Sequence, residues 1–176
     1  ASRSGLHSAT RHPRGLRVSL LIASISAAVF APVLLRADSI PATILDPALQ
    51  VEVVVNAGLS QPIGIVFLAP NDFFVLEKSS GQIKRVINGV VQAIPVLDLA
   101  VNSASERGLL SMELDPGFPA NPFAYIRWTE SSTGIDTSVT LDTPLLGNRV
   151  DRFAWNGANF VFDRAIVAMR ARQTDN

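Results

Sequence analysis

The chain has no cysteine, and its two histidines, His7 and His12, both lie near the N-terminus. Without cysteine there can be no disulfide, no thiolate metal site and no cysteine nucleophile. From residue 38 onward the chain also has no imidazole, which excludes a Ser-His-Asp triad and a histidine-ligated metal from that part. Any chemistry within residues 38–176 must therefore use other side chains.

Basic residues are scarce in the same part of the chain. Of the 15 Lys and Arg residues, five precede residue 38, whereas all 15 Asp and Glu residues lie at or after it. Residues 38–176 thus hold ten basic and 15 acidic residues and carry a formal charge of −5. Because a phosphate-binding surface needs clustered Lys and Arg, nucleic acid is not an expected partner.

The N-terminal segment has the order of a secretory signal. Four arginines (Arg3, Arg11, Arg14 and Arg17) precede an uncharged apolar run over residues 18–35, and small residues around Ala37 offer a cleavage point. We expect residues 1–37 to be a helical signal peptide, with a retained membrane anchor as the alternative. The sequence therefore predicts an exported protein, periplasmic or secreted, which would meet a membrane only through an uncleaved N-terminal segment.

Residues 38–176 read as one β-rich domain. After a leader with two prolines, short runs rich in Val, Ile, Leu and aromatic residues alternate with Gly, Pro, Asn, Asp and Ser, as strands and tight turns require. The expected strands are 51–57, 63–68, 73–77, 83–87, 90–97, 109–114, 123–129 and 149–155. The pattern does not decide between strand and short helix over 160–170.

A weak internal repeat runs through these strands. Leu68-Ala69-Pro70 and the strands that follow it correspond to Leu114-Asp115-Pro116 and its successors, 46 residues further on, with an insertion at about residues 131–147 in the second copy. This step is typical of one four-stranded blade of a β-propeller. The domain then holds about two to two and a half blades, whereas a closed propeller needs at least four. This shortfall and the initial Ala indicate part of a longer protein.

Several motifs, taken in order, resemble one family. They are Gln61-Pro62-Ile63-Gly64-Ile65, Val75-Leu76-Glu77-Lys78, Gly81-Gln82-Ile83, Pro95-Val96-Leu97-Asp98-Leu99, Glu106-Arg107-Gly108-Leu109-Leu110, Asp115-Pro116-Gly117-Phe118 with Asn121-Pro122, and Asn148-Arg149-Val150. Over about residues 51–172, the chain resembles the first two blades of the glucose/sorbosone dehydrogenase family. These are soluble sugar dehydrogenases that use pyrroloquinoline quinone, and the propeller domains of hedgehog-interacting-type proteins are related to them.

The resemblance implies an all-β fold, a six-bladed β-propeller of which this chain holds the N-terminal blades. It implies oxidation of a sugar or alcohol by hydride transfer to pyrroloquinoline quinone, with a histidine base, a calcium ion and an external electron acceptor. The family's base and calcium ligands would lie beyond Asn176, so we expect this chain to be inactive alone. A non-catalytic propeller that binds a protein or carbohydrate is the alternative, and an inert truncation product is a third.

Glu106 is the candidate cofactor-binding residue. The resemblance places it where the sugar dehydrogenases have a glutamine near the quinone, and an ionised carboxylate there can accept a hydrogen bond but cannot donate one. Glu106 and Arg107 can instead form a local ion pair or cap a turn. Glu77 and Lys78 are interpreted as the solvated shoulder of a hairpin. Tyr125, Trp128 and Trp155 are expected to serve packing more than sugar stacking.

Overall fold

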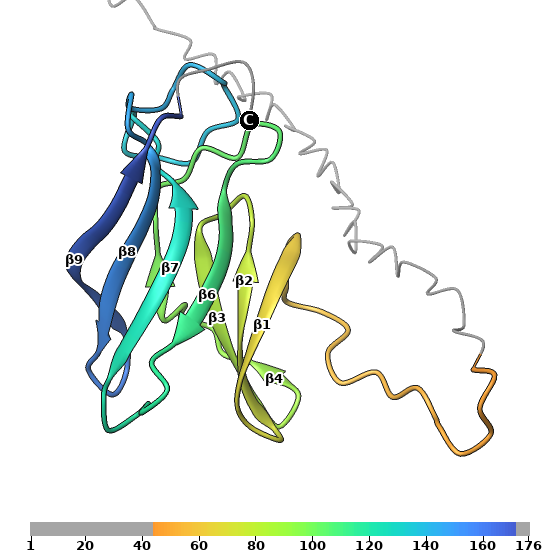
Figure 1. Cartoon of the computed structure of the whole chain (residues 1–176). Coiled ribbons are helices and arrows are strands. Elements are labelled where there is room, and N and C mark those ends of the chain that lie inside the picture. Colours follow the sequence, from red (N-terminus) through yellow and green to blue (C-terminus); the bar gives the residue numbers. More distant parts are fainter. Residues whose placement is uncertain (1–43, 172–176) are drawn as a thin grey trace, which may run out of the picture. The chain divides into compact units, whose positions relative to one another are not determined.

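The computed structural model describes residues 44–171, and these residues form two antiparallel β-sheets (Figure 1). The all-β class expected from the sequence is confirmed for this range. No helix long and apolar enough to cross a membrane occurs among residues 44–171. The expected signal peptide lies outside the described residues.

The first sheet is a meander in the order β1-β2-β3-β4. Its strands are β1 (Pro62–Ala69), β2 (Asp72–Glu77), β3 (Gln82–Ile87) and β4 (Val90–Val91), with β5 (Leu97–Asp98) pairing with another part of β3. Asn88 and Gly89, both at positive φ, connect β3 to β4. Two consecutive residues at positive φ match the twist of the flanking strands, and Asn-Gly adopts this turn at little cost.

The second sheet repeats this arrangement in the order β6-β7-β8-β9. Its strands are β6 (Leu109–Leu114), β7 (Phe123–Thr129), β8 (Asn148–Trp155) and β9 (Phe160–Met169). The repeat thus corresponds to two neighbouring meanders with the same strand order. The segment left undecided by the sequence, 160–170, is a strand because it pairs with β8 along its length.

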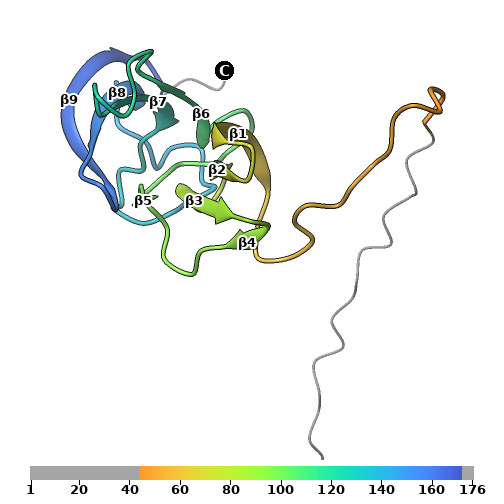
Figure 2. The ribbon, with the colours of Figure 1, turned by 90° about the horizontal axis from the view of Figure 1, so that it is seen from below.

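The core lies between the two sheets, where β6 lies next to β1 and β2 (Figure 2). In β2 and β7 alternate residues enter this layer, as the period of a β-strand requires. The fully buried side chains from the first sheet include Phe74, Leu76 and Ile83, and those from the second include Ile126 and Phe153. One face of each sheet is therefore covered by the other sheet.

The aromatic residues in this layer confirm the packing role expected for two of the three candidates. Trp128 belongs to the core, and Trp155 packs against it. The ring of Trp155 lies 5.7 Å from that of Phe74 and 4.9 Å from that of Phe160, centroid to centroid. Such tilted contacts are favourable for aromatic pairs.

Two strand predictions need correction. Residues 51–57 form no strand, although Val51, Val53 and Val55 alternate as a strand would. A strand is stabilised by a hydrogen-bonded neighbour, and the described residues provide none for this segment. The expected strand over 90–97 is reduced to β4 and β5, which pair with different parts of β3 and are separated by irregular chain.

Glu77 also departs from expectation, because its side chain is buried and only 1% exposed. Its carboxylate accepts hydrogen bonds from the Ser60 amide at 2.6 Å and the Ser80 hydroxyl at 2.7 Å, and Lys84 Nζ lies 3.1 Å away. Burial by itself raises the pKa of Glu77, but the three hydrogen-bonding partners outweigh it, so the pKa lies below its ordinary value of 4.5. Glu77 therefore ties the segment before β1 to the β2–β3 hairpin.

We predict that Glu77→Gln destabilises the fold by about 1–3 kcal/mol, because the buried partners lose a charged acceptor. Since the folded pKa of Glu77 is lowered, its contribution is fully present above about pH 4.5 and is lost as the pH falls through the folded value. Urea unfolding at pH 7 and pH 3 measures this. Glu113→Gln, at an exposed position of β6, is the control. Equal losses for both variants at pH 7 would contradict the role given to Glu77.

Candidate functional site

Glu106 lies on a tight turn that leads into β6, at one end of the two sheets. Its side chain is exposed, whereas Ala104, Arg107 and Gly108 around it are buried. The turn is closed by a hydrogen bond from the Arg107 amide to the Ala104 carbonyl at 3.1 Å. The sequence placed Glu106 before a buried strand, and the structure bears out that position.

The first sheet holds this turn from the other side. The Lys78 ammonium donates to the Ser105 carbonyl, and the Leu109 amide donates to the Lys78 carbonyl at 3.0 Å. Gly108 has a φ of +125°, and a Cβ atom there would lie 2.4 Å from the Lys78 carbonyl oxygen. Glycine is therefore required, because the backbone of the β2–β3 hairpin passes too close for a side chain.

Arg107, next to Glu106 in the chain, points into the protein. Its guanidinium donates to the Thr140 carbonyl at 2.7 Å, so this side chain anchors the long loop between β7 and β8. Arg107 and Glu106 also line a small cavity of about 60 Å³ together with Leu110, Arg127, Thr129, Asn148 and Ala171. An acid and two arginines therefore surround one small polar hollow.

A charged network at the end of β7 and β8 was not anticipated from the sequence. Asp151, fully buried, accepts from Trp128 Nε1 at 2.9 Å and from Arg149 Nε at 2.8 Å. Arg149 also contacts Glu130 at 2.8 Å. Although burial lowers the pKa of Arg149, the hydrogen bonds to Glu130 and Asp151 raise it overall, which keeps the guanidinium charged. Only the pairing of β7 with β8 brings these groups together.

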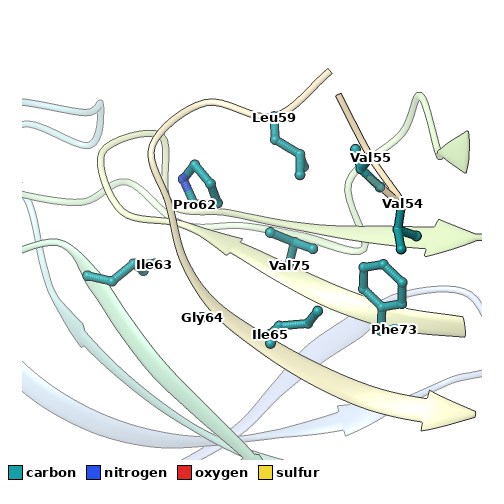
Figure 3. Close-up of a pocket in the computed structure, with 9 residues that line it drawn as sticks. All are labelled: Val54, Val55, Leu59, Pro62, Ile63, Gly64, Ile65, Phe73 and Val75. Carbon is teal, nitrogen blue, oxygen red and sulfur yellow. The ribbon is translucent and has the colours of Figure 1, made fainter. Parts of the chain in front are cut away.

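A second hollow is purely apolar and lies on the outer face of the first sheet. It is a groove of about 380 Å³, and Figure 3 shows Val75 of β2 between Leu59 and Ile65. Phe73 and Val75 form a small cluster there with Val86, covered in part by Val55 and Leu59. Ile65 and Phe67 of β1 remain more than half exposed on this face. The groove offers contact area but no acid, base or nucleophile.

Metal-binding groups do not gather in residues 44–171, where no cluster of three or more Asp, Glu, His or Cys side chains is placed to hold an ion. Asp136 and Asp142 are used inside the β7–β8 loop. Asp136 accepts from the Val101 amide at 3.0 Å, and Asp142 accepts from the Thr137 hydroxyl at 3.1 Å. These carboxylates organise the loop.

One family model and several solved structures match this chain. The sequence profile described as Glucose / Sorbosone dehydrogenase matches residues 59–165. An oxidoreductase from Thermus thermophilus, described as a glucose dehydrogenase, has 28% sequence identity and a TM-score of 0.52, over 66% of this chain and 31% of that one. The pyrroloquinoline-quinone-bound aldose sugar dehydrogenase of Streptomyces coelicolor has 20% identity and a TM-score of 0.42, over 64% of this chain and 30% of that one. No curated protein matches the chain. The chain thus spans about a third of the length of these solved structures.

We predict that Gly108→Ala destabilises the protein by clearly more than Gly134→Ala. Both glycines have positive φ, but a Cβ at Gly108 meets the Lys78 carbonyl, whereas a Cβ at Gly134 has no atom within 4 Å. The Gly134 change should cost about 1–2 kcal/mol from backbone strain alone, and Gly108 should add the cost of moving the hairpin. Chemical denaturation measures both. Equal costs would show that Lys78 does not constrain the turn.

Proposed function

The chain belongs to the glucose/sorbosone dehydrogenase family, and from this premise we propose that it is the N-terminal part of an exported quinoprotein dehydrogenase. The whole protein would oxidise a sugar or alcohol hydroxyl by hydride transfer to pyrroloquinoline quinone and pass the electrons to an external acceptor. The observation that carries the proposal is the family match, which covers both meanders and the Glu106 turn. Export rests on the basic and apolar order of residues 1–37.

We further propose that the two sheets are neighbouring blades of a six-bladed propeller. Each contains a four-stranded antiparallel meander, to which β5 adds a fifth strand in the first sheet, and the strands that begin the two meanders, β1 and β6, lie side by side. The exposure of apolar side chains on the outer face of the first sheet supports this arrangement. Ile63, Ile65 and Phe67 have exposed fractions of 46–61% there. A further blade would cover these side chains as the second sheet covers the opposite face. Burial of such apolar surface is the main favourable term in packing sheets.

Residues 44–171 do not by themselves fit the quinone. The hollow beside Glu106, about 60 Å³, is too small for a three-ring molecule. Pyrroloquinoline quinone carries carboxylates, and the exposed Glu106 carboxylate would repel them. Of the nearby cations, Arg107 donates to the Thr140 carbonyl and Lys78 to the Ser105 carbonyl, and the third, Arg127, is exposed beside the same small hollow. The described residues would supply one edge of a site that other blades complete, and we derive no chemical step from them.

Glu106 is the observation that favours the second candidate function, a non-catalytic propeller that binds a protein or carbohydrate. An exposed carboxylate on a rigid turn is suited to accept hydrogen bonds from hydroxyl or amide groups of a ligand. The same carboxylate is unfavourable beside an anionic quinone. The two functions therefore differ in what Glu106 contacts, and quinone binding separates them.

We predict that the 176-residue chain shows no quinone-dependent oxidation of glucose or other aldoses, whereas the protein extended by the missing blades does. Residues 38–176 have no histidine to accept the hydroxyl proton, and two blades cannot exclude water from a bound quinone. Dye-linked oxidation after addition of pyrroloquinoline quinone and calcium measures this. Turnover by the short chain above the quinone-only blank would contradict the prediction. Inactivity of the extended protein across a panel of sugars would favour the binding module.

Glu106→Gln should strengthen quinone binding by the extended protein by about tenfold, because the change removes one like charge and adds an amide donor. A fluorescence or absorbance titration with pyrroloquinoline quinone measures the affinity without relying on turnover. Glu113→Gln removes the same charge from an exposed position of β6 and is the matched control. Unchanged or weaker binding by Glu106→Gln would mean that Glu106 does not face the quinone.

A further inference from the structure

The loop between β7 and β8, residues 131–147, lies at the same end of the sheets as the Glu106 turn (Figure 1). It contains five large apolar side chains that are all at least half exposed, namely Ile135, Val139, Leu141, Leu145 and Leu146. Burial of large apolar side chains therefore contributes little to fixing this loop. Its order must come from its hydrogen bonds.

Asn102 provides the central hydrogen bonds. Its side chain is fully buried, and its amide nitrogen donates to the carbonyls of Val139 at 2.9 Å and Asp142 at 3.0 Å. Its amide oxygen accepts from the Ala104 amide at 3.0 Å. One side chain thus pairs two backbone carbonyls of the loop and one backbone amide of the Glu106 turn. Ala or Leu would remove all three bonds and leave the Val139 and Asp142 carbonyls with only the amides of Asp142 and Ser132 as donors, and Asp would lose both donors.

Arg107 joins the same two segments a short distance along the chain. The residue is 4% exposed, and its guanidinium reaches the Thr140 carbonyl, which lies in the sequence between the two carbonyls bound by Asn102. Backbone hydrogen bonds complete the contact, from the Ser103 amide to the Thr137 carbonyl at 2.8 Å and from the Thr137 amide to the Val101 carbonyl at 2.9 Å. Hydrogen bonds from residues 101–107 therefore connect the Glu106 turn to the loop at several points.

We propose that Asn102 and Arg107 are positioning residues that hold the β7–β8 loop and the Glu106 turn as one rigid unit. The position of Glu106 then depends on Asn102 and Arg107, whose side chains are buried. The turn cannot shift without breaking the buried hydrogen bonds that these two side chains make. The proposal extends the proposed function, since this unit would form a preformed edge of the quinone site. The structural part, coupling of loop and turn, holds for the chain whatever its ligand.

Amide hydrogen exchange of the 176-residue chain tests the coupling. In Asn102→Ala and in Arg107→Met, exchange of the backbone amides at positions 132, 137 and 107 should be at least about tenfold faster, because their hydrogen bonds report local opening of the loop and the turn. Exchange in β2 should change less than about twofold. Arg107→Lys should restore part of the protection, since a lysine can reach the same carbonyl with one donor.

Asn121→Ala is the matched control, because Asn121 bonds Asp115 in an exposed turn between β6 and β7. It should leave the loop unchanged. Unaltered loop exchange in both Asn102→Ala and Arg107→Met would overturn the proposal. So would equal acceleration in β2, which would show that these residues serve general stability. If Asn102→Ala does not fold, Arg107→Met and Arg107→Lys decide the question.

A titration of the extended protein with pyrroloquinoline quinone tests the link to the site. If Arg107 positions Glu106, Arg107→Met should reduce the tenfold gain in affinity expected from Glu106→Gln to less than about twofold, and Arg107→Lys should restore most of that gain, while Asn121→Ala leaves it unchanged. A parent protein that binds no quinone would count against the proposed function. The positioning role of Asn102 and Arg107 would then be tested by hydrogen exchange alone. A gain from Glu106→Gln that is equally large with and without Arg107→Met would overturn the positioning role.

Discussion

The apolar layer between the two sheets is the constraint on which the other features depend. Phe74 and Leu76 from β2 meet Ile126 and Phe153 from β7 and β8 in one continuous core. Because successive side chains of a strand point to opposite faces, a shift of one residue would exchange buried and exposed positions along the whole strand. In β7 such a shift would carry Arg127 inward and Ile126 outward. The core therefore fixes the register of both sheets.

Register in turn decides which turns meet at the end of the sheets. The pairing of β2 with β3 ends at the hairpin that contains Lys78. The pairing of β6 with β7 places Gly108, directly before β6, next to this hairpin. The two segments then approach closely enough that a glycine is required. This close approach of the Lys78 hairpin to Gly108 fixes where the Glu106 turn and the β7–β8 loop lie. The polar network around Asn102 and Arg107 is thus a consequence of the apolar layer beneath it.

Charged side chains within the structure show why local patterns mislead about burial. Glu77 lies between a β-strand and a polar hairpin, where the sequence predicts a solvent-exposed side chain. It is buried instead, and one of its hydrogen-bond donors is Ser60, 17 residues earlier in the chain. Asp151 is buried in the same way by Trp128 and Arg149. Each carboxylate is tolerated because several donors surround it. Some of these donors, namely the Ser60 amide for Glu77 and Trp128 Nε1 for Asp151, come from distant segments and cannot be recognised from the neighbouring sequence.

The sequence by itself determined the family, the all-β class, most strands from 62 to 155 and the turns at Asn88-Gly89 and Asp115-Pro116-Gly117. These features depend on side-chain alternation and turn chemistry, which act over a few residues. Tertiary structure alone decided that 160–169 is a strand, that 51–57 is not, and that Arg107 faces the loop while Glu106 faces solvent. These outcomes depend on which partner each segment finds, and a strand or a buried charge is stable only with that partner in place.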